Sequence, residues 1–254
     1  MEPDENSRPD VDLAAIDLRG ALLRGRDLRG LEIRDSQVDG LRIADSIGDE
    51  VSVSGALGRV IVDDVDVTDH VRAVLDERLP ERRMAREAST PDEIRATWAA
   101  LQDRWDSVLT AVRDSPTDIA NLQVRGEWSV VQTLRHLRFA ADAWIGTAVL
   151  EESAPHHPWG LPADGTTEEV VSALGLDLDA TPDLDQVLEM RDERRAAVEE
   201  LLQGLDEQEL DRRCAGTPGP GYPVREYRVR RCLRVLLTEE AEHLRYTLRD
   251  LAAV

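Results

Sequence analysis

Apolar residues recur every five positions through the N-terminal third of the 254-residue chain. The series is Leu13, Leu18, Leu23, Leu28, Ile33, Val38 and Ile43. A helix would scatter these side chains around its axis, and a strand would place successive ones on opposite faces. A coil that turns a corner every five residues would place all of them inside. Residues 1–67 are therefore predicted to fold as a cornered coil ending in extended chain.

The stretch IDLRGALLRGRDLRGLEIRDSQVDGLRI resembles the pentapeptide-repeat family. In that family a central Leu or Phe stacks inside a right-handed, four-sided β-helix. The match covers about seven units, fewer than two full coils, so we expect it to cap or pack on the C-terminal part of the chain. Some members mimic DNA, but outward arginines such as Arg19, Arg24 and Arg29 would imitate a phosphate backbone poorly. A scaffold role is expected instead.

The coil is followed by short extended and helical pieces. Alternation over Arg59–Val67 is typical of a half-buried strand, and the stretch is interpreted as the last extended rungs of the coil or as a short hairpin. A first helix is expected over Asp69–Arg83 with Thr68 as its N-cap, and residues 68–89 are taken as a connecting helix and linker. His70, in its first turn, is interpreted as an exposed surface histidine.

Composition excludes several classes of function. A net charge of −21 and a pI near 4.6 argue against nucleic-acid binding, because phosphate would be repelled. No run of 18 apolar residues predicts a membrane span, and the start MEPDENSRPD lacks the features of a signal peptide. Cys214 and Cys232 do not make a disulfide framework. Together these features predict a cytoplasmic protein.

Residues 90–254 read as a mainly α-helical domain. Thr90, Pro91 and Glu93 form a helix start, and the helix is expected to run to about Asp114. Further long helices are expected after Ser129, over Leu184–Leu202, and from near Arg225 to Leu251, with a short one over Asp206–Arg212. Four long helices favour a four-helix bundle. The long segment after Leu150 is a candidate functional loop.

Two of these helices carry a candidate metal site. Glu239 and His243 are four residues apart, which places them on one helical face, and Glu240 would also reach that face at a spacing of three. His136, in the segment GEWSVVQTLRHLRFAADAW, is the candidate third ligand. Two histidines and one carboxylate are a ligand set that zinc accepts while keeping a position open.

The segments GEWSVVQTLRHLRFAADAW, HHPWGLP and TEEAEHLRYTLRDL resemble the DinB superfamily, in a branch with an added N-terminal pentapeptide-like segment. The resemblance implies a four-helix bundle holding Zn²⁺ or a similar divalent ion through His136, Glu239 and His243. It also implies a thiol S-transferase or isomerase that uses a low-molecular-weight thiol such as mycothiol. A homodimer is a further option that the resemblance raises.

The sequence departs from that family pattern around the second histidine. Leu244 stands where many relatives have a second histidine, and Ala241 and Glu242 stand where relatives of this branch have aromatic residues. His157, Trp128, Glu240 and Tyr246 are secondary candidates for lining the pocket. Cys232, seven residues before Glu239, is interpreted as a buried structural cysteine. No protein nucleophile is assigned, since a metal-activated thiol would not need one.

Three functions therefore stay open. The first is a divalent-metal-dependent thiol S-transferase acting on a small electrophilic metabolite. The second is a metal-free protein of the same fold that binds a small molecule or confers self-resistance. The third is an acidic interaction protein that uses the pentapeptide-like segment.

Overall fold

The protein is described from a computed structural model, in which residues 16–34, 36–163, 165–220 and 222–254 can be described. Leu13, the first member of the five-residue repeat, lies outside these residues. The chain divides into two compact units, residues 1–42 and 43–254.

The first unit turns corners where the repeat predicts them. Three hydrogen-bonded turns recur ten residues apart, each closed by an N–H···O bond of 2.9–3.0 Å. Each has at its third position a glycine with φ between 73° and 79°: Gly20, Gly30 and Gly40. This is the type II turn, whose third position requires positive φ. Gly25, with φ of 59°, marks a corner midway between the first two.

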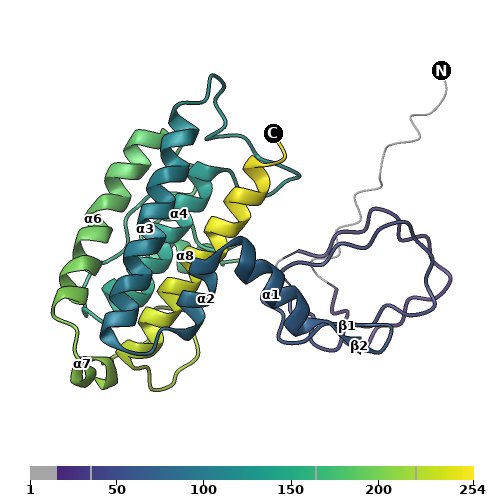
Figure 1. Cartoon of the computed structure of the whole chain (residues 1–254), viewed down its shortest axis with the longest axis horizontal. Coiled ribbons are helices and arrows are strands. Elements are labelled where there is room, and N and C mark those ends of the chain that lie inside the picture. Colours follow the sequence, from purple (N-terminus) through teal and green to yellow (C-terminus); the bar gives the residue numbers. More distant parts are fainter. Residues whose placement is uncertain (1–15, 35, 164, 221) are drawn as a thin grey trace. The chain divides into compact units, whose positions relative to one another are not determined.

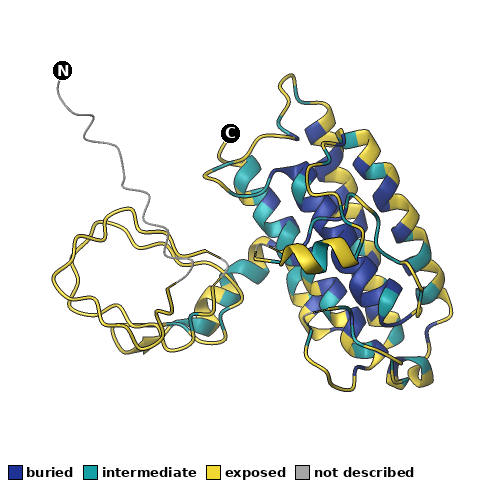
Figure 2. Cartoon of the chain, turned by 180° about the vertical axis from the view of Figure 1, so that it is seen from behind, coloured by how far each residue is buried: buried dark blue, intermediate teal, exposed yellow. Residues whose placement is uncertain are grey.

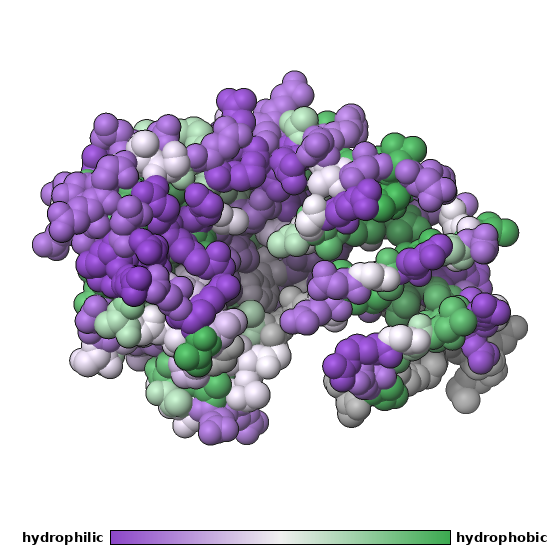
Figure 3. Space-filling view, turned by 90° about the horizontal axis from the view of Figure 1, so that it is seen from below, coloured by the Kyte–Doolittle hydropathy of each residue, from purple (hydrophilic) through white to green (hydrophobic). Residues whose placement is uncertain are grey.

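The apolar side chains of this unit are not enclosed, which contradicts the expectation. Leu18 is 51% exposed and Leu28 47% exposed, and no strand is formed by the described residues 16–34 and 36–42. Nearly all described residues of the unit are drawn as exposed in Figure 2, and apolar residues among them show green in Figure 3. A repeat this short has too few neighbouring coils to cover its own apolar face. The predicted β-helix with a buried leucine core is therefore not seen here.

The second unit contains a hairpin of two short strands, β1 (Ile61–Val62) and β2 (Val65–Asp66). The strands are antiparallel, with Val62 opposite Val65. Asp63 and Asp64 both have positive φ, at 46° and 64°. Such a turn matches the twist of paired strands, and aspartate tolerates it. Of the two expectations for this stretch, the short hairpin is confirmed, and the last extended rungs of the coil are not formed there.

The predicted helix over Asp69–Arg83 is two helices, α1 (Thr68–Arg78) and α2 (Pro80–Glu87). Leu79 separates them with φ of −139° and ψ of 87°. Proline excludes the helical conformation from the residue before it but suits the first position of a new helix. Pro80 therefore ends one helix and begins the next.

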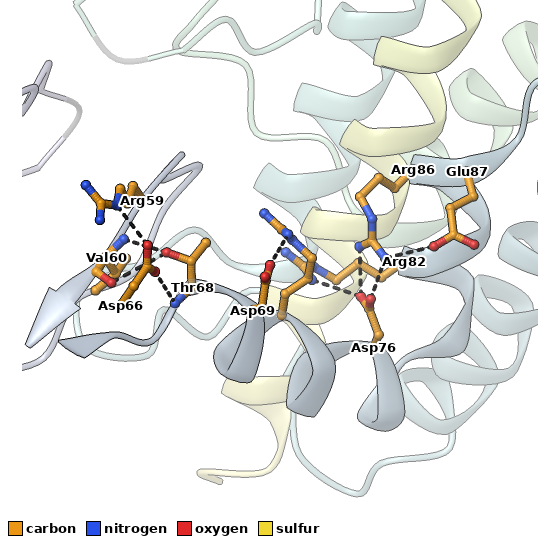
Figure 4. Close-up of polar contacts among 10 residues, drawn as sticks. Arg59, Val60, Asp66, Thr68, Asp69, Asp76, Arg82, Arg86 and Glu87 are labelled. Atoms are coloured by element: carbon orange, nitrogen blue, oxygen red, sulfur yellow. Dashed lines mark hydrogen bonds and ion pairs between the residues drawn. The ribbon is translucent and has the colours of Figure 1, made fainter.

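Side chains fix both ends of α1 (Figure 4). Thr68 is the first helical residue and not the cap that the sequence suggests, because its Oγ1 accepts a hydrogen bond from Val60 N at 2.9 Å. At the other end, Asp76 accepts hydrogen bonds from Arg82 and Arg86 of α2. The break at Leu79 is thereby bridged by ion pairs.

Four long helices form the bundle predicted from residue 90 onward (Figure 1). They are α3 (Pro91–Arg113), α4 (Val130–Ala141), α6 (Leu184–Gln203) and α8 (Val229–Leu251). α4 contacts both α6 and α8, and α3 contacts the same two helices, which closes a four-helix arrangement. α2 packs on α3 and α8 at its side.

Local signals in the sequence set most helix starts. Capping boxes open three of the helices, pairing Thr90 with Glu93, Ser129 with Gln132 and Asp183 with Gln186. α8 begins at Val229 and not near Arg225 as expected. The reason is a bridge between Arg213 and Arg228, which holds the chain before Val229 extended.

The core fills the space between the helices, drawn dark blue in Figure 2. Its largest fully buried side chains include Trp105, Tyr227, Leu101, Leu134, Leu137, Ile145, Leu233 and Leu244. No helix within the described ranges is both long enough and apolar enough to cross a membrane.

The shorter elements lie between the long helices. α4 runs directly into a π-helical turn, η1 (Asp142–Thr147), which the sequence did not suggest. A helix, α5 (Glu168–Ala173), begins directly after the segment 151–167 that was expected to be irregular. α7 (Glu207–Asp211) matches the expected short helix.

Candidate metal centre

The three predicted ligands come together where α4 meets α8. His136 lies on α4, and Glu239 and His243 lie one turn apart on α8. Glu239 Oε2 is 3.6 Å from His136 Nε2 and 3.3 Å from His243 Nε2. One ligand atom from each residue lies within 4.8 Å of the others.

These separations fit a metal ion. Ligand atoms bound about 2.0–2.2 Å from a tetrahedral zinc lie roughly 3.3–3.6 Å from one another. Both carboxylate–imidazole distances fall in that range, and a set of two imidazoles and one carboxylate is what catalytic zinc sites accept. The described residues could therefore hold a divalent ion through three protein ligands.

A backbone carbonyl fixes the tautomer of one ligand. His136 Nδ1 is 3.0 Å from the carbonyl oxygen of Leu161. A carbonyl oxygen only accepts, so the ring proton of a neutral His136 is on Nδ1. The lone pair of Nε2 is then directed at Glu239 and His243, the arrangement in which metal-binding histidines are usually held.

Ionisation of Glu239 also suits a metal ligand. Burial alone raises the pKa of this carboxyl, but in the metal-free site hydrogen bonds and charge interactions from His136 and His243, with their Nε2 atoms protonated, lower it more. The net result is a pKa of about 2. Glu239 is therefore negatively charged at neutral pH.

Aromatic rings border the three ligands. The ring of Trp128 lies 4.8 Å from that of His136 and stacks on His243 at 6.0 Å with an angle of 12°. Tyr246 packs edge-on against His243, also at 6.0 Å. Two secondary candidates, Trp128 and Tyr246, are thus adjacent to the predicted ligands.

Glu240 points elsewhere. Its carboxylate is 1% exposed and lies 2.6 Å from the guanidinium of Arg191 in the core. Arg191 also lies over the ring of Trp105. The alternative in which Glu240 supplies the carboxylate is therefore wrong, and Glu240 does not line the site.

Hydrogen bonds hold the loop that carries His157 against α4. Arg135 donates hydrogen bonds to the carbonyl oxygens of Trp159 and Ala180 at 2.8 Å each. The carbonyl oxygen of Arg135 accepts a hydrogen bond from Leu161 N at 3.2 Å. The carbonyl oxygen of the same Leu161 contacts the ring of His136, the next residue on α4. Within the loop, His157 Nδ1 accepts from Trp159 N and its ring packs on that indole. These bonds hold Leu161 in place.

A buried charge network anchors the start of the same loop. Asp142, which is 0% exposed, accepts hydrogen bonds from Arg138 and Arg194 and from His157 N at 3.0 Å. Arg194 also donates to Pro155 O at 3.1 Å. No motif in the sequence marked this group, although Arg138 and Asp142 do have helical i, i+4 spacing.

Close packing reinforces that anchor. A Cβ atom on Gly146, in the π-helical turn, would lie 2.6 Å from Pro155 Cβ. Only glycine therefore lets the loop approach η1 so closely. The loop, the π-helical turn and α4 together form the support behind His136.

The fold and the three ligands define a helical-bundle protein with a candidate divalent-metal centre between two of its helices. Residues 100–247, more than half of the chain, match the family model described as the DinB superfamily. The chain belongs to this superfamily, which confirms that part of the resemblance. No curated protein and no solved structure matches the chain.

Proposed function

We propose that this protein is a divalent-metal-dependent enzyme that transfers the sulfur of a small thiol to a small electrophilic metabolite. One observation carries the proposal: Glu239 Oε2 lies 3.6 Å from His136 Nε2 and 3.3 Å from His243 Nε2, and one ligand atom from each of the three residues lies within 4.8 Å of the others. Membership of the DinB superfamily supports it.

Each of the three residues has a defined part. His136, His243 and Glu239 would hold the ion, and the charge of Glu239 would leave a divalent centre with a net charge near +1. A bound divalent ion would lower the pKa of a thiol at the open position, and the thiolate is the reactive form of sulfur. No serine or cysteine nucleophile is then required from the chain.

The surrounding residues would shape the substrate space. Trp128 and Tyr246 pack against His243 and would limit the access of water to it. Leu161 keeps the proton of His136 away from the site. We propose zinc or a similar ion as the metal, mycothiol as a candidate thiol, and a small molecule as the partner.

Metal content tests the proposal directly. Elemental analysis of protein purified without a histidine tag should give about one divalent ion per chain. His136→Ala and His243→Ala should lose it, whereas His70→Ala, at an exposed position of α1, should keep it. No metal in the wild type after reconstitution with zinc, nickel or manganese would overturn the proposal.

Activity is the second test. The metal-loaded protein should accelerate loss of free thiol when mycothiol is mixed with a panel of electrophiles, and His243→Ala should not. In each turnover a carbon–sulfur bond forms and the thiol proton is released to solvent or to the displaced group. Full metal occupancy with no acceleration of any thiol would reject the transferase assignment while leaving the metal centre.

The metal-free alternative has its own structural support. Protonated His136 and His243 would satisfy Glu239 as ion pairs at the distances seen, with no metal present. In that case the bundle would act as a small-molecule binding or self-resistance protein. The metal analysis separates the two, because only the first proposal predicts a stoichiometric ion.

A further inference from the structure

The two cysteines of the chain meet beside the start of α8. Cys214 Sγ and Cys232 Sγ are 3.8 Å apart, although 18 positions separate them in the sequence. They are the only cysteines among the 254 residues. A pair this close needs a shift of about 1.8 Å to reach the ~2.05 Å length of a disulfide bond.

Backbone contacts hold both partners in place. Cys214 N donates to Tyr227 O at 2.9 Å, and Val229 N donates to Arg212 O at 3.1 Å, on either side of the Arg213–Arg228 bridge. Cys232 is in the first turn of α8, where its N–H bonds Arg228 O. The approach of the two sulfurs is therefore fixed by secondary structure on both sides.

Only one cysteine of the pair is accessible to solvent. Cys232 is fully buried, whereas Cys214 is partly exposed and lies at the edge of the core. A reagent in solution would thus reach Cys214 first, and Cys232 would be the second thiol to react. This order is the one that an exchange through a mixed disulfide requires.

We propose that Cys214 and Cys232 form a reversible intramolecular disulfide by exchange with a low-molecular-weight disulfide. The thiolate of Cys214 attacks one sulfur of the reagent and releases the other half as a thiol. Cys232 then attacks Cys214 Sγ and releases the second half. Both cysteines are oxidised, the reagent is reduced to two thiols, and the two cysteine protons end on those thiols.

The rate is set by burial and proximity together. Burial raises the pKa of both thiols, so the first attack is slow at neutral pH. The second attack is intramolecular and therefore fast once the mixed disulfide exists. The pair would respond to sustained oxidising conditions and not to brief ones.

The bond would close the loop that precedes α8. Tyr222 and Tyr227 of this loop pack edge-on against Trp144 at 5.1 and 5.7 Å. Oxidation would fix the base of a loop that packs on Trp144.

Intact-mass analysis of the full chain tests the inference, and it does not depend on metal or activity. After incubation with oxidised glutathione, the wild type should lose the mass of two hydrogen atoms and show no free thiol when denatured. Dithiothreitol should restore both thiols. Amide hydrogen exchange between Cys214 and Val229 should be slower in the oxidised form.

Single substitutions separate the two steps. Cys232→Ser should accumulate a glutathione adduct at Cys214, because the second thiol is missing. Cys214→Ser should react slowly or not at all, because Cys232 is buried. Two free thiols in the treated wild type, a lasting glutathione adduct on it, or a disulfide between chains would each overturn the inference. The wild-type measurement decides the matter even if a variant fails to fold.

Discussion

Leu161 holds the imidazole of His136 through its backbone, with 3.0 Å between the carbonyl oxygen and Nδ1. The residue belongs to a loop, not to a bundle helix. Arg135 binds that loop at Trp159, and it binds the segment after α5 at Asp177 and Ala180. The orientation of a predicted metal ligand on α4 thus depends on a residue 25 positions further along the chain.

Arg135→Met should weaken metal binding without removing a ligand. The substitution removes hydrogen bonds to three backbone carbonyls, including that of Trp159 in the loop of Leu161, and loss of such supporting contacts costs about 10–100-fold in metal affinity. Competition with a chromogenic chelator measures the dissociation constant. Arg104→Met, at an exposed position of α3, is the matched control. An unchanged affinity in Arg135→Met would show that the loop does not orient His136.

Adjacent carboxylates on α8 should give opposite results. Glu239→Gln should lose the metal and keep most of its stability, because this side chain faces the two histidines. Glu240→Gln should keep the metal but lose about 3–5 kcal/mol of unfolding free energy, since Arg191 would be left buried without its partner. Metal analysis and urea unfolding of both variants check this. Metal loss in Glu240→Gln with the fold intact would contradict it.

Asp142 should be important for stability. Asp142→Asn removes the negative charge between two buried arginines, Arg138 and Arg194, and breaking a buried ion pair typically costs about 3–5 kcal/mol. Asp179→Asn, at an exposed loop position, should change the unfolding free energy by less than about 0.5 kcal/mol. Denaturant unfolding measures both. Equal stability of the two variants would refute a structural role for the network.

Glu93 gives the clearest pH dependence. Hydrogen bonds from the Ser89 and Thr90 backbone lower the pKa of this carboxyl to about 2, from an ordinary value near 4.5. A depressed folded-state pKa stabilises the fold above pH 4.5, and that stabilisation is lost as the pH falls toward 2. Carboxyl chemical shifts in an NMR titration report the pKa. Glu93→Gln keeps an N-cap partner and should remove this part of the acid dependence.

Local rules in the sequence predicted much of the bundle. Thr90 with Glu93, and the four-residue spacing of Glu239 and His243, follow from backbone geometry that any helix imposes. The approach of His136 to Glu239 does not, because it depends on which helices pack together. The family resemblance implied that pairing, and the structure places the two side chains 3.6 Å apart.

Other features depend on contacts that local sequence rules do not contain. The choice between Glu239 and Glu240 depends on whether Arg191 of a distant helix is available as a partner in the core. The break before Pro80 has a local cause, although the helix was predicted to continue through it to Arg83. The five-residue repeat predicted corners correctly, whereas enclosure of Leu18 and Leu28 requires covering coils that so few repeats do not supply.

The π-helical turn at Asp142–Thr147 has a consequence for how this chain tolerates insertions and deletions. Such a turn holds one residue more than the α-helix around it, and one residue rotates the following side chains by about 100°. Deleting a single position there would restore a regular helix and swing Gly146 and Trp144 away from Pro155 and Tyr222. Related chains that differ in length at this point should therefore differ in the loop behind His136, even where all three ligands are the same.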